Sequence, residues 1–432
     1  MRVVSSVAMT ATDVHRTIEA LWRMESARLI AAMARRVRDV GLAEELAQDA
    51  LVSALEQWPA AGIPDNPAAW LMTTAKNRAI DQLRRRRMLE GKHALLGHEL
   101  EREQQLSAGS IEACAEDVIG DDLLRLIFIA CHPVLSTEAR TALTLKLIGG
   151  LSTAEIARAF LVPEATLAQR LVRAKRVLAE REVPFELPRR EQLGARLASV
   201  LEVIYLIFNE GYSATAGADW MRPALCEEAL RIGRILAELA PGESEVHGLV
   251  SLMEIQASRL RARVGADGEP VLLMEQNRAL WDRLLIHRGL LALARGERLG
   301  ERRGTYLLQA AIAACHARAA AATDTDWVNI TALYDELARL TGSPVVELNR
   351  AVAVAMAYGP AAGLALTQPL VDGGALESYH LLPSVRADLL AKLGRYEEAR
   401  DEFERAAQLT QNMREQELLK NRAAACRRAR VS

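Results

Sequence analysis

The residues best suited to chemistry in this sequence are basic, and they gather between Lys76 and Arg87. Lys76, Arg78 and the arginine run at 84–87 are accompanied there by a single acid, Asp81. Such a density of positive charge attracts phosphate groups. The stretch therefore indicates recognition of a nucleic acid.

Amide and aromatic side chains nearby add a means of reading bases. Asn77 and Arg84 carry donors and acceptors that can pair with base edges, and Arg85 adds a further positive charge. Trp70 offers a face on which an unstacked base can lie. Tryptophan also fills hydrophobic cores, so two interpretations of Trp70 stay open.

A second basic stretch, residues 151–180, has the pattern of two helices joined by a tight turn. Ser152 and Glu155 have the spacing of a capping box, and Pro163 suits the first position of the second helix. The apolar stripe predicted for that helix consists of Leu167, Leu171, Ala174 and Leu178. This is the form of a helix-turn-helix, whose second helix enters the major groove. An ordinary helical hairpin with a solvated basic face is the alternative.

The elements that must position these residues are helices. The 432 residues are 50% hydrophobic but only 4% aromatic, and Ala and Leu dominate. No alternating run is long enough for a strand, so we expect an all-α protein of about two to four domains. The net charge of −2 hides the basic clusters, so a nucleic-acid partner is indicated only locally.

Metal, cofactor and membrane functions find little support. The five cysteines form no Cys-x-x-Cys pair, and the histidines lack metal-ligand spacing. Cys131 and His132 are neighbours, but adjacent residues on a helix point apart, so no catalytic pair is predicted. No signal peptide is evident, and the most apolar stretch, 198–208, is too short to cross a bilayer. We expect a cytoplasmic protein with reduced thiols, no cofactor, no metal and no membrane partner.

An acidic helix is predicted over 42–58. Glu45 and Asp49 lie four residues apart and therefore share a face, with Gln48 beside them. No His or Cys stands near these carboxylates, so an exposed acidic face is favoured over a metal site. Such a face can also be a docking surface.

The chain divides by composition. Asn66 and Pro67 begin the basic helix 67–87, and a linker mixing charges, Gly and Ser follows at 89–120. A second helical domain covers 121–184, in which Ser136 caps a helix over 137–147. The remainder, 185–432, is helical by periodicity. Within about 345–410, Gly359 and Gly394 stand 35 residues apart in similar contexts, which suggests tetratricopeptide-like repeats.

Together these parts resemble a bacterial sigma factor of the extracytoplasmic-function class (group IV). AEELAQDALVSAL and NPAAWLMTTAKNRAIDQLRRRR, within 12–88, are similar to region two, and 121–184 is similar to region four. IYLIFNEGYSATAG, DTDWVNITALYDEL, the Asp372-Gly373-Gly374 turn and the repeat-like end resemble the subgroup with a large tetratricopeptide-like C-terminal extension.

The resemblance implies partners and no enzymatic activity. Glu45, Gln48 and Asp49 would dock on the β′ clamp helices of core RNA polymerase, and the β flap of the polymerase would be a second contact. Trp70, Asn77 and Arg84 would face single-stranded bases of the minus-ten element. The minus-thirty-five element would be read by Glu164, Thr166, Gln169, Arg170 and Arg173, with Lys175 nearby on the same helix. The C-terminal extension would regulate the sigma segments in cis or bind another protein.

The sequence also departs from the pattern of that class. Leu161 stands where the motif's turn usually has glycine, and Ala165 and Ala168 replace a usual Gly and Lys. The competing hypothesis is a helix-turn-helix regulator whose C-terminal helices sense a ligand or a protein. An enzyme within 185–432 ranks last, because no triad, metal cluster or phosphate loop is evident there.

Overall fold

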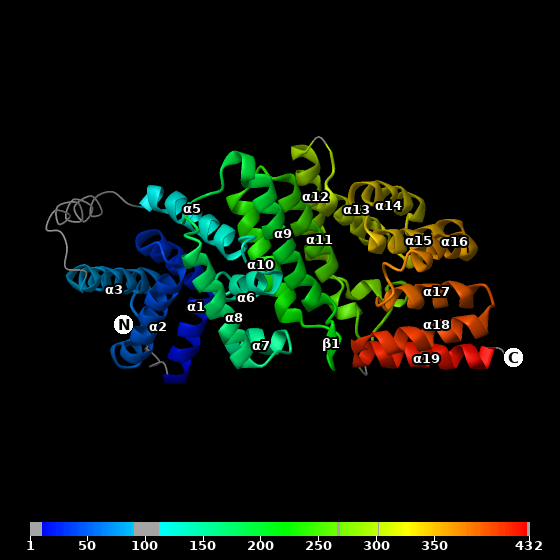
Figure 1. Cartoon of the computed structure of the whole chain (residues 1–432), viewed down its shortest axis with the longest axis horizontal. Helices are drawn as coiled ribbons and strands as arrows, with labels where there is room; N and C mark the ends of the chain where they lie inside the picture. The colour runs from blue at the N-terminus through cyan, green and yellow to red at the C-terminus, as the bar shows by residue number, and fades with distance from the viewer. Residues whose placement is uncertain (1–10, 90–111, 266–267, 301, 430–432) are drawn as a thin grey trace, which may run out of the picture. The chain divides into compact units, whose positions relative to one another are not determined.

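The computed structural model describes residues 11–89, 112–265, 268–300 and 302–429, except for the side chains of 11–13, 85–89 and 112–120. Their regular structure is helical apart from two strands of two residues each, so the predicted all-α class is confirmed (Figure 1). The chain forms two compact units that divide after Val203.

The first unit holds two groups of helices. α1, α2 and α3 pack on one another, α6 packs on α7 and α8, and α1 also contacts α5. Its cores contain Ile30 and Met33 of α1, Leu46 of α2 and Leu143 of α6. The helices are α1 (Ala11–Val37), α2 (Val40–Ala61), α3 (Pro67–Leu89), α5 (Glu112–Ala130), α6 (Thr137–Leu147), α7 (Thr153–Ala159), α8 (Glu164–Glu180) and the first part of α9 (Arg190–Tyr212).

Two helices run further than the sequence predicts. α2 continues past Pro59 to Ala61, because a proline in the last turn removes only one backbone hydrogen bond. α5 begins at Glu112, inside the linker predicted for 89–120. α5 passes through Gly120 without a break, because one glycine costs a helix only about 1 kcal/mol. The part of the predicted linker at 90–111 lies outside the described residues.

In the second unit, most helices pack on their neighbours along the chain. α11 contacts α10, α12 and α13, and from α13 to α19 each helix contacts the next. The helices are α10 (Pro223–Leu239), α11 (Ser244–Ala257), α12 (Arg283–Leu299), α13 (Thr305–Arg318), α14 (Trp327–Thr341), α15 (Pro344–Tyr358), α16 (Pro360–Asp372), α17 (Leu381–Lys392), α18 (Tyr396–Leu409) and α19 (Met413–Ala429), with short 3-10 turns at Leu260–Ala262, Leu273–Glu275, Arg278–Leu280 and Ala322–Asp324.

A small strand pair joins distant parts of the second unit. β1 (Ala216–Gly217) pairs in parallel with β2 (Gln411–Asn412). The buried Asn412 amide donates to the carbonyls of Ala214 and Asp219, both at 2.9 Å. Because buried amides are stable only when paired, these bonds hold β2 beside β1.

Residues 344–409 form two pairs of packed helices, α15 with α16 and α17 with α18. Gly359 and Gly394 stand between the helices of each pair with φ of 102° and 76°, values that favour glycine. A Cβ on Gly363 would lie 2.4 Å from that of Ala355, so α16 approaches α15 as closely as small residues allow. Helical pairs therefore occur in the range predicted for tetratricopeptide-like repeats, and the assignment to that repeat class stays a prediction.

Candidate nucleic-acid interface

α3 has one buried side and one exposed side. Asn66 Oδ1 accepts the N–H of Ala69 at 3.0 Å, so the predicted cap forms. Leu71, Ala75 and Ala79 are buried, and the helix packs on α1 and α2. The side chains exposed on α3 include Thr73, Asn77 and Arg84. The two predicted base-reading residues are thus accessible.

Trp70 is half-buried at the start of α3. Its ring meets that of the buried Trp58 of α2 edge to face, with centroids 5.3 Å apart and planes at 69°. This geometry is favourable for an aromatic pair. Core packing therefore accounts for part of the indole, and the rest remains exposed on the helix that carries Asn77 and Arg84.

Among the other predicted DNA contacts on α3, Arg78 has partners within the bundle. Arg78 lies 3.0 Å from Asp49 of α2, and it also donates to Ser53 Oγ at 2.6 Å. Burial, followed by the positive charges of Arg36 and Arg35, lowers the pKa of Lys76. Arg78 thus fixes α3 on α2. Arg85 belongs to α3, but its side chain lies outside the described residues.

The helix-turn-helix forms over 152–180. Ser152 Oγ accepts the N–H of Glu155 at 3.2 Å, and Glu155 Oε2 accepts the N–H of Ser152 at 2.8 Å, which is the predicted capping box. The turn takes Leu161 through a left-handed φ of 52°. This conformation explains why glycine suits the position.

The proposed first position of α8 needs one correction. Pro163 precedes the helix with ψ of 139°, and α8 begins at Glu164. An extended ψ directs the chain into the helix from outside, so the proline occupies the N-cap position instead. Its side chain has no oxygen to cap the helix, and Glu164 places a carboxylate in the first turn, near the positive end of the helix dipole.

The two sides of α8 are sharply divided. The predicted stripe is buried and consists of Leu167, Leu171, Ala174 and Leu178. Arg170 is half-buried at the edge of this stripe. The predicted base-reading side exposes Glu164, Thr166, Gln169 and Arg173. A helix built this way can be held by the protein on one side while its polar side chains meet a groove of DNA.

Lys175 lies differently from the other predicted contacts of α8. Its Nζ is 2.6 Å from Glu44 Oε2 of α2, and Lys146 of α6 lies 3.8 Å from the same carboxylate. Only 4% of the Glu44 side chain is exposed, so this ion pair lies inside the first unit. Two further ion pairs, Arg35–Asp122 at 3.2 Å and Arg23–Glu155 at 2.9 Å, also join α1 to later helices.

Glu44 is a site residue that the sequence analysis missed. It sits beside Glu45 in the sequence, but it neighbours the buried Ala43 and Ala47 and turns inward with them. The signal was its position at the edge of the buried stripe of α2, since a helix repeats every 3.6 residues.

The three predicted polymerase-binding residues of α2 differ in exposure and in their bonding partners. Glu45 and Asp49 are exposed. Asp49 already pairs with Arg78, and the half-buried Gln48 donates to Glu44 at 2.8 Å. Glu45 is therefore the carboxylate of this group that has no ion-pair or hydrogen-bond partner among the described residues.

The Cys131–His132 pair has the environment of packing residues. Burial raises the pKa of Cys131 to about 11, and its Sγ lies 3.3 Å from Thr144 Oγ1. Burial also lowers the pKa of His132 to about 4, and Nδ1 accepts the N–H of Val134. A protonated thiol beside an imidazole that is already engaged is a poor nucleophile.

Neither a metal-binding cluster nor a membrane-spanning helix occurs among the described residues. No cluster of three or more His, Cys, Asp or Glu side chains there could hold a metal ion. In the same residues, no helix combines the length and apolarity needed to span a membrane.

Comparison with known families assigns three parts of the chain. Residues 21–88 match the family model of Sigma-70 region 2, and residues 125–178 match that of Sigma-70 region 4. Residues 196–297 match a family of unknown function, DUF6596. The first two matches include nearly all of α3 and α8, the helices described above.

Similar proteins support the same assignment. An uncharacterized protein of Rhizobium meliloti (strain 1021) is 44% identical over 386 residues, which cover 89% of this chain and 90% of that protein. The ECF RNA polymerase sigma factor SigK of Mycobacterium ulcerans (strain Agy99) is 29% identical over 35% of this chain and 78% of its own length. SigK of Mycobacterium sp. (strain KMS) is 28% identical over 35% of this chain and 76% of its own length. No solved structure matches the chain.

Two sigma regions in this order define an RNA polymerase sigma factor, a subunit that binds DNA and directs transcription initiation. The chain belongs to the extracytoplasmic-function sigma factors, and it carries a large C-terminal extension. Sigma factors in general are not enzymes, and their partners are core RNA polymerase and promoter DNA.

Proposed function

We propose that α3 and α8 are the two promoter-contacting helices. α3 would bind the minus-ten element through Asn77, Arg84 and the exposed part of Trp70. α8 would read the minus-thirty-five element through Glu164, Thr166, Gln169, Arg170 and Arg173. The observation that carries this proposal is the division of α8 into a buried stripe and an exposed polar side.

Transcription from a reconstituted polymerase tests this assignment. Arg173→Ala should reduce initiation at a promoter with both elements, and Asn77→Ala should reduce opening of the minus-ten region. Arg176→Ala is the matched control, because Arg176 is exposed on the same helix and pairs with Glu180 at 3.3 Å. Equal losses in all three variants would contradict specific roles for Arg173 and Asn77.

We also propose that the outer side of α2 docks on the β′ clamp helices, while region four meets the β flap. Glu45 supports the first contact, because it is an exposed carboxylate without a partner among the described residues. Glu45→Lys should weaken binding to core polymerase, whereas Glu19→Lys, a charge reversal on an exposed residue of α1, should not. Asp49→Lys is less informative, because it would also break the pair with Arg78. A cytoplasmic location is part of this proposal, because a subunit of RNA polymerase acts where the promoter DNA lies.

The C-terminal extension is proposed to regulate the sigma segments in cis or to bind a protein partner. Helical pairs such as α15–α16 and α17–α18 offer surfaces for either role. A cut after Pro184 would remove α9, whose Arg196 donates to the Phe128 carbonyl at 2.6 Å. A cut after Val203 keeps that contact and follows the boundary between the units.

Transcription by residues 1–203, compared with the full chain, distinguishes these roles. Higher output would indicate inhibition by the extension, and lost output would indicate that the extension is required. Circular dichroism of the shortened chain is the control for folding. Unchanged output from a folded fragment would contradict regulation in cis and leave the partner-binding role.

A further inference from the structure

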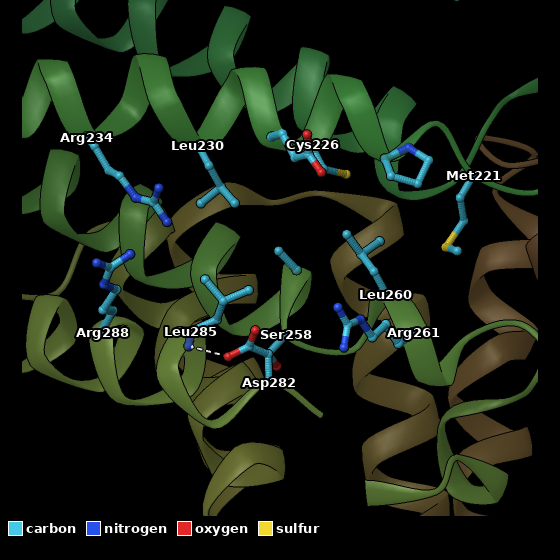
Figure 2. A pocket seen from close by; sticks show the side chains of 13 residues that line it. Met221, Cys226, Leu230, Arg234, Ser258, Leu260, Arg261, Asp282, Leu285 and Arg288 are labelled. Atoms are coloured by element: carbon cyan, nitrogen blue, oxygen red, sulfur yellow. Dashed lines mark hydrogen bonds between the residues drawn. The ribbon is translucent and has the colours of Figure 1, made fainter. Parts of the chain in front are cut away.

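A cavity of about 520 Å³ lies in the second unit between α10, the end of α11 and the start of α12. Figure 2 shows its walls. Leu230, Leu260 and Leu285 supply an apolar lining. Arg234, Arg261 and Arg288 line the same space. The cavity thus combines apolar surface with several guanidinium donors, a combination typical of small-molecule sites.

The guanidinium groups of Arg234 and Arg288 point toward one another from α10 and α12 (Figure 2). Arg234 Nε lies 2.8 Å from Oε1 of Glu254, a carboxylate that is 2% exposed, so this arginine is held in place. Arg288 has no ion pair or hydrogen bond among the described residues. Glu254 neutralises one of these two positive charges at Arg234, which leaves an excess that an anion would neutralise.

The excess of positive charge lies at one end of the cavity. The lining also includes Arg261 and two carboxylates, Glu227 and Asp282. The Asp282 carboxylate accepts the N–H groups of Leu284 and Leu285 at 2.9 and 3.1 Å. Beyond Arg234 a neighbouring hollow is lined by Arg295, seven residues after Arg288 and therefore on the same face of α12. Glu238 lines that hollow too.

We propose that this cavity binds a small organic anion with an apolar body. Its carboxylate, phosphate or sulfonate group would lie between Arg234 and Arg288, because guanidinium groups match these anions with paired hydrogen bonds. Its apolar body would lie against Leu230, Leu260 and Leu285. The site lies outside both sigma regions, so its occupancy would be an input to the protein that is separate from promoter recognition.

Binding of 8-anilino-1-naphthalenesulfonate to the full chain tests the proposal, because this probe joins an anionic group to an apolar body. Fluorescence titration and calorimetry should show one saturable site per chain. Arg288→Gln should weaken binding at least ~10-fold, because it removes the charge that lacks a partner. Arg288 is exposed, so this variant should keep the melting temperature of the parent.

Matched variants separate the site from general charge and hydrophobicity. Arg283→Gln removes an exposed charge from the same helix outside the cavity, and it should change affinity less than ~2-fold. Leu285→Asn should weaken binding of the probe, whereas Leu284→Asn, at a neighbouring residue that is 58% exposed, should not. Inorganic phosphate, which has no apolar body, should compete only weakly.

Three outcomes would overturn the proposal. They are the absence of a saturable site, equal affinity in Arg288→Gln and the parent, and equal weakening by Arg283→Gln and Arg288→Gln. The last result would show that the probe responds to the overall charge of α12. If inorganic phosphate binds as tightly as the probe, the apolar body is not part of what the site recognises, and that half of the proposal is wrong.

Discussion

Arg173 of α8 is exposed on the side of its helix opposite a buried stripe, whereas Arg259 and Arg278 of the second unit are each less than a tenth exposed. The guanidinium carbons of the latter two lie 5.7 and 4.7 Å from the centre of the Trp281 ring. Arg278 also donates to the carbonyls of His316 and Ala319 at 2.5 and 2.7 Å. The same residue type thus has opposite surroundings in the two units.

The difference shows what decides the role of an arginine. An exposed guanidinium keeps its donors available for phosphates or base edges, so removing it should affect binding and leave the fold intact. A buried guanidinium has given its donors to the protein, so removing it leaves buried acceptors without partners. Substitutions should therefore separate loss of stability from loss of DNA affinity.

The largest expected effect is on stability. Arg278→Met should lower the free energy of unfolding of the second unit by about 4 kcal/mol, because two carbonyls and Thr325 Oγ1 lose a charged donor. Urea denaturation followed by circular dichroism measures the change. Arg176→Met on α8 is the control and should stay within about 0.5 kcal/mol of the parent. Similar losses of unfolding free energy in both variants would contradict the distinction between buried and exposed arginines.

Next in size is a pH effect at His316, which lies beside these arginines. Burial, followed by the charges of Arg259 and Arg278, lowers its pKa to about 4. The unfolded chain therefore binds a proton between pH 6.5 and 4 that the folded chain excludes, so stability falls as pH falls through this window. The loss from this residue should approach about 3 kcal/mol at pH 4.

His316→Gln should flatten this dependence, as measured by urea denaturation at pH 7, 5.5 and 4.5. The first unit offers a parallel case, because burial lowers the pKa of His132 to about 4 as well. Its transition should therefore keep its own pH dependence in the His316 variant. If the unfolding free energy of the second unit depends on pH equally in His316→Gln and in the parent, protonation of His316 does not destabilise the fold.

The exposed arginine should show the reverse pattern. Arg173→Ala should weaken binding to promoter DNA by about 2 kcal/mol and lower the slope of log K against log salt by about one, while the melting temperature stays constant. Fluorescence anisotropy with labelled duplex at several salt concentrations measures both quantities. A drop in melting temperature with no change in affinity would place Arg173 among the structural arginines.

The sequence predicted helices and their faces better than it predicted the partners of charged side chains. The stripe of α8, the capping box at Ser152 and the cap at Ser136 follow from local spacing, and the structure has all three. Local spacing also placed Arg78 and Lys175 on DNA-binding helices. Their carboxylate partners, Asp49 and Glu44, lie on another helix, 29 and 131 residues away in the sequence.

The cavity between α10 and α12 escaped prediction for a similar reason. Arg234 and Arg288 lie in separate helices, and each has the appearance of a solvated surface residue when its own helix is considered alone. Their convergence depends on the packing of both helices around α11. Pairing between distant segments is a property of tertiary structure, which a helical period cannot specify.

The smallest expected effect concerns the turn that precedes α8. Leu161 has φ of 52° and is 55% exposed. The left-handed conformation costs free energy, and burial of the side chain offsets little of that cost. Leu161→Gly should relieve that cost, although the more flexible unfolded chain offsets part of the gain. We expect a net stabilisation of about 0.5 kcal/mol, which would slow amide hydrogen exchange in residues 151–180 about 2-fold. Leu161→Ala removes the side chain but keeps the left-handed cost, so it should leave exchange unchanged. If Leu161→Gly alters affinity for promoter DNA while Arg176→Ala does not, the turn sets the orientation of Arg173, and the exposed arginine depends on its scaffold as the buried ones do.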